Sequence, residues 1–150
     1  MDTQETKGAE KTENPGEAPA AQTSPYEMMG GGEMVRRVVD RFYEIMDTSP
    51  ETVGIRAMHA KDLSSVRERL FEFLSGWLGG PPLYFQRPDH NCIMSAHRPF
   101  QIGAAERDQW MFCMRRAMAD CEVQPELRIL LDKPFMRMCE AFSSRPKPNA

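Results

Sequence analysis

Apolar residues recur at helical spacing in four stretches of the chain. The first stretch predicts a helix with one apolar face, made by Val35, Val38, Val39, Phe42, Ile45 and Met46. Polar turn residues at 47–50 are expected to end this helix, and a short helical stretch is expected around 51–58. No segment alternates apolar and polar residues for any length. The pattern therefore predicts an all-α protein.

The second stretch begins after Asp62, which is expected to cap the N-terminus of a long helix. Its apolar positions are Leu63, Val66, Leu70, Phe73, Leu74, Trp77 and Leu78. Two glycines followed by two prolines, at 79–82, are expected to end it, because neither residue type continues a helix well. Residues 83–91 are expected to form a loop, and a short helix before Arg98 is expected to contain His97.

The third and fourth stretches complete the helical pattern. The apolar positions of the third are Trp110, Cys113, Met114, Ala117, Met118 and Cys121. A fourth helix is expected to begin near Pro125, because proline suits the first helical turn. Pro134 lies inside this last pattern and lacks a backbone N–H, so we expect it to kink or break the helix.

Both ends of the chain are polar. Residues 1–25 contain no large apolar side chain after Met1, so they cannot bury enough surface to offset the entropy of ordering. We therefore expect a disordered N-terminal extension at 1–25, one folded domain at 26–142 and a flexible tail at 143–150.

Charge and hydropathy narrow the class of protein. The net charge is −3, which favours neither nucleic acid nor an acidic membrane surface as a partner. The N-terminus has no signal-peptide pattern, and no apolar run approaches the roughly 18 residues that cross a bilayer. A cytoplasmic location is expected. The four cysteines form no CxxC pair, so we expect core thiols rather than a disulfide frame or a zinc site.

Three histidines are present, and His97 is the best candidate for a metal ligand. It follows a short apolar segment and precedes a proline turn, where a neutral imidazole is able to bind iron through one nitrogen. Haem iron needs one such base, an apolar slot, and polar groups on the opposite face. Composition and spacing permit haem without requiring it, because a lone histidine is more often structural.

Several blocks of sequence follow one another in a specific order. They are VVDRFY at 38–43, WLGGPPLY at 77–84, HRPF at 97–100 and ERDQW at 106–110, with Gly30 and Gly31 before the first. With these blocks, the chain resembles the group II truncated haemoglobins, a 2-over-2 version of the globin fold. The resemblance covers residues 26–122, with a looser match to the end. It implies haem b held without a covalent bond, and no CxxCH motif is present for covalent attachment.

The resemblance also implies a role for individual residues. His97 matches the proximal iron ligand, while Tyr43 and Trp110 match polar residues that face the bound ligand on the distal side. Arg69 and Tyr84 match positions that meet the haem propionates. The second predicted helix, which begins after Asp62, would lie on the distal side of the haem and line its slot with Val66, Leu70 and Phe73.

His59 lies where the family has Phe, Tyr or His, at the corner before the distal helix. Three roles stay open: a wall residue that makes one hydrogen bond, a group that stabilises the ligand, or a sixth iron ligand when no external ligand is present. Tyr43 is the less favoured sixth ligand. The loop before His97 lacks two arginines of the family pattern, so Arg87, Arg98 or His90 is expected to compensate at the haem edge.

The implied function is binding of O2 and other diatomic ligands, NO and CO, with high affinity and slow release. Slow release suits redox, NO or peroxide chemistry better than bulk transport. Peroxidase or nitric-oxide dioxygenase turnover is left open, and would need an external reductase because the chain has no GxGxxG motif. The alternative is a globin-like sensor or a haem-free helical interaction module, with Met136 and Met138 on its surface. A monomer or a weak homodimer is expected.

Overall fold

The computed structural model describes residues 23–88, 97 and 102–143. Within these residues the structure is helical and contains no strand, which confirms the all-α prediction. The elements in chain order are α1 (Pro25–Met29), α2 (Gly31–Thr48), η2 (Pro50–Thr52), α3 (Val53–Ala57), α4 (Ser64–Trp77), α5 (Leu83–Gln86), α7 (Ala104–Asp120) and α8 (Pro125–Phe142).

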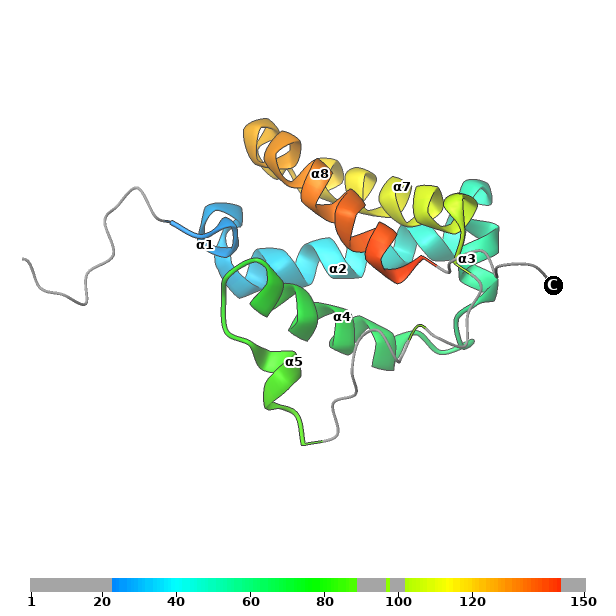
Figure 1. The fold of residues 1–150 in the computed structure, drawn as a ribbon, viewed down its shortest axis with the longest axis horizontal. Helices are drawn as coiled ribbons and strands as arrows, with labels where there is room; N and C mark the ends of the chain where they lie inside the picture. The colour runs from blue at the N-terminus through cyan, green and yellow to red at the C-terminus, as the bar shows by residue number, and fades with distance from the viewer. Residues whose placement is uncertain (1–22, 89–96, 98–101, 144–150) are drawn as a thin grey trace, which may run out of the picture.

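Two pairs of helices make the body of the molecule. Helix α2 packs against α4, and α7 packs against α8; the two pairs meet mainly through α2 and α7. Figure 1 shows α7 and α8 lying over α2 and α4, with α5 below α4. This arrangement confirms the predicted 2-over-2 fold.

The core is built from the predicted apolar stripes. All six stripe residues of α2 are buried, and so are the α7 residues from Cys113 to Met118 that belong to its stripe. Helix α8 adds buried side chains at a spacing of four residues, namely Leu127, Leu131, Phe135 and Cys139. Burying each large apolar side chain contributes about 1.5–3 kcal/mol, so these stripes hold the two pairs together.

The glycine pair after α4 anchors the N-terminal helix. Gly79 has a φ of +95°, which favours glycine, and Tyr26 donates its backbone N–H to the carbonyl of Leu78 at 2.9 Å. A Cβ on Gly80 would lie 2.5 Å from Cδ2 of Tyr26, so the tyrosine ring occupies the space that a side chain would need. The predicted stop of α4 is confirmed, and the same residues seat α1.

The start of α4 differs from the prediction by one residue, because the N-cap is Leu63 and Asp62 lies just before it. Asp62 Oδ1 accepts hydrogen bonds from the backbone N–H of Ser64 at 2.9 Å and from its hydroxyl at 2.7 Å. These bonds hold the pKa of the Asp62 carboxyl below its usual value. The aspartate therefore supplies an acceptor for the unpaired donors of the first helical turn.

One expectation about secondary structure is wrong, and another is narrowed. Residues 83–86 form the short helix α5 rather than a loop, because Tyr84 is buried there and its ring packs edge-on against Phe73, with centroids 6.2 Å apart. Helix α8 continues through Pro134, so of the two outcomes expected there, a kink or a break, the break does not occur. The missing N–H leaves the Leu130 carbonyl without its helical donor, but Leu130 is exposed and water can reach that side of the helix.

Structure begins before the predicted domain boundary. The Ser24 hydroxyl accepts a hydrogen bond from the Glu27 backbone N–H at 3.2 Å and caps α1, so residues 24 and 25, assigned to the N-terminal extension, belong to the first helix and its cap. The rest of both predicted tails, and the segment expected to be helical before His97, lie outside the described residues. In the part of the chain that is described, no helix has the length and apolar character that a membrane span requires.

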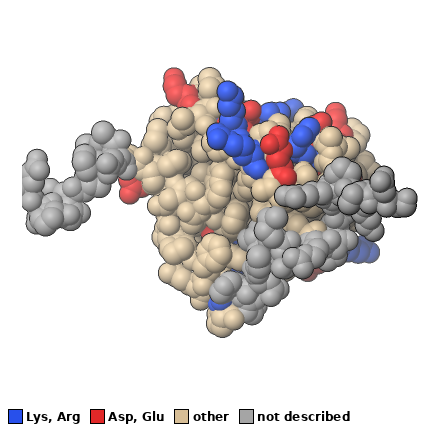
Figure 2. Space-filling model, in the orientation of Figure 1, with Lys and Arg blue, Asp and Glu red and all other residues tan. Residues whose placement is uncertain are grey.

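Charged side chains of both signs lie close together on the surface. Figure 2 shows them interspersed along the upper part of the visible face, beside a broad uncharged area. Ion pairs join neighbouring helices: Arg36 and Glu68 link α2 to α4 at 2.5 Å, and Arg115 and Asp132 link α7 to α8 at 2.7 Å. Exposed pairs of this kind contribute little stability, about 0–1 kcal/mol each.

Candidate haem site

The three residues predicted for the distal pocket lie in one aromatic cluster. Phe42 of α2 stands at its centre, with its ring 5.0 Å from that of Tyr43 and 5.2 Å from that of Trp110, both edge-on. The His59 ring lies 6.0 Å from that of Tyr43, again edge-on. Such pairs are each worth about 0.5–1.5 kcal/mol beyond burial, so they hold the polar residues in fixed positions. Sequence reasoning assigned Phe42 only to the core.

Tyr43 is a buried phenol whose single O–H makes only one long hydrogen bond within the protein. Its hydroxyl donates to the Val66 carbonyl at 3.5 Å, the long end of the range, and the side chain is 4% exposed. Burial raises the pKa of Tyr43 far above its usual value, and the nearby Cys113 thiol adds to the effect. The phenol therefore stays protonated and can donate a better hydrogen bond to a ligand than the one it makes to Val66.

Trp110 lies half-buried on α7, between two phenylalanines. Its ring is 5.2 Å from that of Phe42 and 5.7 Å from that of Phe135 in α8. An indole nitrogen can only donate, and no hydrogen bond from it to a described residue is found. Because no fully buried side-chain nitrogen or oxygen in the described part lacks a partner, this N–H lies in accessible space.

His59 is held by a backbone carbonyl. Its Nδ1 lies 2.7 Å from the carbonyl oxygen of Ile55, which can only accept, so the hydrogen is on Nδ1. In the neutral ring, Nε2 is then an acceptor. The guanidinium of Arg56 fixes the backbone around this corner, since it donates to the carbonyls of Ala60 and Lys61 at 3.0 Å each.

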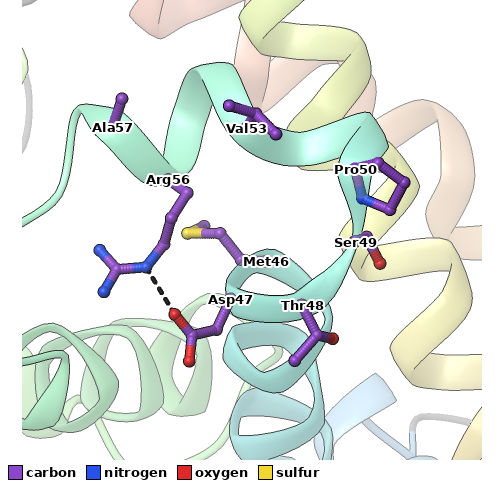
Figure 3. A pocket seen from close by; sticks show the side chains of 8 residues that line it. All are labelled: Met46, Asp47, Thr48, Ser49, Pro50, Val53, Arg56 and Ala57. Carbon is purple, nitrogen blue, oxygen red and sulfur yellow. Dashed lines mark hydrogen bonds and ion pairs between the residues drawn. The ribbon is translucent and has the colours of Figure 1, made fainter.

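A surface pocket of about 380 Å³ lies between the end of α2 and α3. Figure 3 shows its lining, from the end of α2 and from α3, with Arg56 bonded to Asp47 at 2.8 Å. None of the predicted site residues lines it. Its chemistry is that of an ion pair holding two helices, so we do not assign it to ligand binding.

His97 lies against the end of the last helix. Its ring stacks on that of Phe142 with centroids 4.4 Å apart and an angle of 18° between the planes. Phe142 is the last residue of α8, and sequence reasoning did not identify it as a site residue. The sequence feature that could have indicated Phe142 is its place as an aromatic residue at the C-terminus of an amphipathic helix. The other loop residues proposed for the haem edge, His90 and Arg98, lie outside the described residues.

The distal helix α4 presents an incompletely covered apolar face. Its predicted slot residues, Val66, Leu70 and Phe73, contact the core yet are only half-buried. A helix face of this kind gains stability when a flat apolar group covers it. With an imidazole in His97 and donors in Tyr43 and Trp110, the donor set fits haem.

The predicted propionate residues differ in their surroundings. Arg69 is half-buried on α4, whereas Tyr84 is 3% exposed and packs on Phe73. Arg87, expected to compensate at the haem edge, forms an ion pair with Glu72 of α4. Glu72 is 8% exposed, and sequence reasoning did not single it out. The negative charge of Glu72 is therefore balanced by the Arg87 guanidinium, and this ion pair joins α4 to the C-terminal end of α5.

Met136 and Met138, considered as an exposed surface, are half-buried and pack against the core. They thus have the ordinary position of methionines at helical spacing. These two methionines therefore do not form the exposed apolar surface that a haem-free interaction module would use.

Comparison with known proteins gives one family. The family described as bacterial-like globin matches residues 24–143. The curated Group 2 truncated hemoglobin YjbI of Bacillus subtilis (strain 168) is 33% identical over 108 residues, which cover 72% of this chain and 79% of that protein.

Solved structures agree with this assignment. The Group II 2-on-2 hemoglobin from the plant pathogen Agrobacterium tumefaciens is 36% identical with a TM-score of 0.78, covering 86% of this chain and 100% of that one. The cold-adapted truncated hemoglobin from the Antarctic marine bacterium Pseudoalteromonas haloplanktis TAC125 is 35% identical with a TM-score of 0.77. The match covers 83% of this chain and 100% of that one. Members of this family in general bind haem and small gaseous ligands. The chain therefore belongs to the bacterial-like globins, as a group 2 truncated haemoglobin with the 2-on-2 fold.

Proposed function

We propose that this globin holds haem b non-covalently through His97 and binds O2, NO or CO beside Tyr43 and Trp110. The observation that supports this most is the clustering of two hydrogen-bond donors around Phe42, with ring distances of 5.0 and 5.2 Å. When bound, haem supplies an iron atom with an open position for a diatomic ligand. The chain's own residues then determine how long the ligand stays.

The two donors act on the ligand through hydrogen bonds in an apolar setting. Trp110 donates its indole N–H and Tyr43 its phenol O–H to the negative end of a polar diatomic ligand. A hydrogen bond to a charged acceptor is worth roughly 1.5–3 kcal/mol. At 1.4 kcal/mol per decade, one such bond slows release by roughly 10- to 150-fold. High affinity with slow O2 release follows.

The remaining site residues hold the cofactor. Val66, Leu70 and Phe73 line the slot from α4, and His97 is held on the proximal side by its stacking on Phe142. Arg69 and Tyr84 are proposed to meet the haem carboxylates. His59 is proposed as a wall residue whose Nε2 faces the distal side, which also makes it the better candidate than Tyr43 for a sixth iron bond at rest.

Slow release favours redox, NO or peroxide chemistry over bulk transport. Turnover as a peroxidase or a nitric-oxide dioxygenase would need electrons from an external reductase. Assays of peroxide and NO consumption with a reductant distinguish these activities from simple ligand carriage. If peroxide and NO are consumed no faster than with free haem, these activities are excluded and reversible ligand binding is the remaining function.

The direct test of the proposal is the absorption spectrum of haem-loaded protein. We expect a strong Soret band, and His97→Ala is expected to lose the iron–imidazole spectrum together with most of its retention of haem. Gln124→Ala truncates an exposed side chain to which no role at the haem site is assigned, and it is the control. A His97→Ala variant with the parent's spectrum and O2 binding would refute the assignment.

A further inference from the structure

A chain of hydrogen bonds joins α7 to His59 through the backbone of Ile55. The Gln109 side-chain oxygen Oε1 accepts from the Ile55 N–H at 2.9 Å. The Ile55 carbonyl in turn accepts from His59 Nδ1–H at 2.7 Å. Gln109 directly precedes Trp110 in α7, so the element that contains one predicted distal donor also holds the backbone that orients the distal histidine.

The packing around Gln109 is tight. A Cβ on Gly54 would lie 3.0 Å from both Nε2 and Oε1 of the Gln109 amide, closer than ordinary contact. Glycine at position 54 therefore leaves the space that the Gln109 amide occupies beside α3. Ile55 itself is buried, 4% exposed, and α3 has only five residues. A helix this short gains little from its own hydrogen bonds, so outside contacts determine its position.

The state of His59 follows from this geometry. A proton held on Nδ1 by a carbonyl leaves Nε2 of the neutral ring as an acceptor. No partner for Nε2 is found among the described residues, and the ring lies edge-on to Tyr43. The distal cluster thus combines two donors, Tyr43 and Trp110, with one acceptor.

We infer that Gln109 is a positioning residue that, through Ile55, keeps the His59 proton on Nδ1 and thereby presents Nε2 to the distal pocket as an acceptor. This inference rests on the proposed haem function for its consequence, since only an unprotonated Nε2 can accept from a protic ligand or bond to iron. The tautomer itself is a property of the protein alone.

Nitrogen NMR of His59 in the haem-loaded CO complex tests the inference. The parent is expected to show one tautomer, with the proton on Nδ1. Gln109→Met keeps the side-chain length but removes the acceptor, and is expected to show a mixture of tautomers and a shifted CO stretching frequency. Gln109→Glu retains an acceptor oxygen and is expected to behave as the parent does. Gln124→Met, at an exposed glutamine before α8, is the matched control.

A second variant covers the case in which Gln109→Met does not fold, as judged by circular dichroism. Gly54→Ala leaves Gln109 in place but displaces its amide, and the same mixture of tautomers is expected. A single Nδ1–H tautomer in a folded Gln109→Met variant or in Gly54→Ala would overturn the inference, as would equal effects of the Met and Glu variants. If the protein fails to bind haem, the proposed function fails, while the tautomer can still be measured in the haem-free protein.

Discussion

Trp110→Phe isolates the contribution of a single distal donor. The Trp110 ring lies between Phe42 and Phe135, at 5.2 and 5.7 Å, so a phenylalanine keeps an aromatic side chain in the same apolar position. What it removes is the indole N–H, which has no hydrogen-bond partner among the described residues. The change therefore costs the ligand a hydrogen bond while leaving the protein without an orphaned polar group.

The expected magnitude follows from that one bond. A loss of roughly 1.5–3 kcal/mol of ligand stabilisation speeds O2 release by roughly 10- to 150-fold. Stopped-flow displacement of O2 by CO measures the release rate directly. CO is less polar than bound O2, so its own dissociation is expected to change much less.

Trp77→Phe is the matched control. Trp77 stacks on the same Phe135, with centroids 4.6 Å apart and 21° between the planes, so the control loses comparable aromatic packing. It is not one of the predicted distal donors. An O2 release rate within about twofold of the parent in Trp110→Phe, or an equal acceleration in Trp77→Phe, would refute the role given to the indole N–H.

Three further changes test the structure around the site. Gly80→Ala forces a Cβ to 2.5 Å from the Tyr26 ring and is expected to lower the free energy of unfolding by about 1–3 kcal/mol in urea denaturation. Glu72→Gln removes the charge that matches Arg87 and is expected to cost about 1.5–3 kcal/mol in the same assay. Burial raises the pKa of Cys139 from 9.0 to about 12, so the unfolded chain ionises first and stability falls as the pH rises through this window. Cys139→Ala is expected to flatten that fall in unfolding measured between pH 8.5 and 10.5, and an unchanged slope would contradict it.

Local pattern by itself was enough to define the four long helices and the family. The stripes of α2 and α7 could be predicted because helix periodicity depends only on neighbours in the chain, and burial of Val39, Phe42 and Cys113 confirms them. The stop at Gly79 could be predicted for the same reason, since its φ of +95° is a local property. The ordered sequence blocks likewise needed no coordinates to indicate a group 2 truncated haemoglobin.

Contacts between residues distant in the chain decided the rest. Tyr84 makes 83–86 helical by packing on Phe73, and Phe142 supplies the surface on which His97 stacks. The carbonyl that accepts from His59 belongs to Ile55, whose N–H is bonded to Gln109, 54 residues away in the chain. No pattern of spacing contains these pairings, because they arise only when separate helices come together and each buried polar group must find a partner.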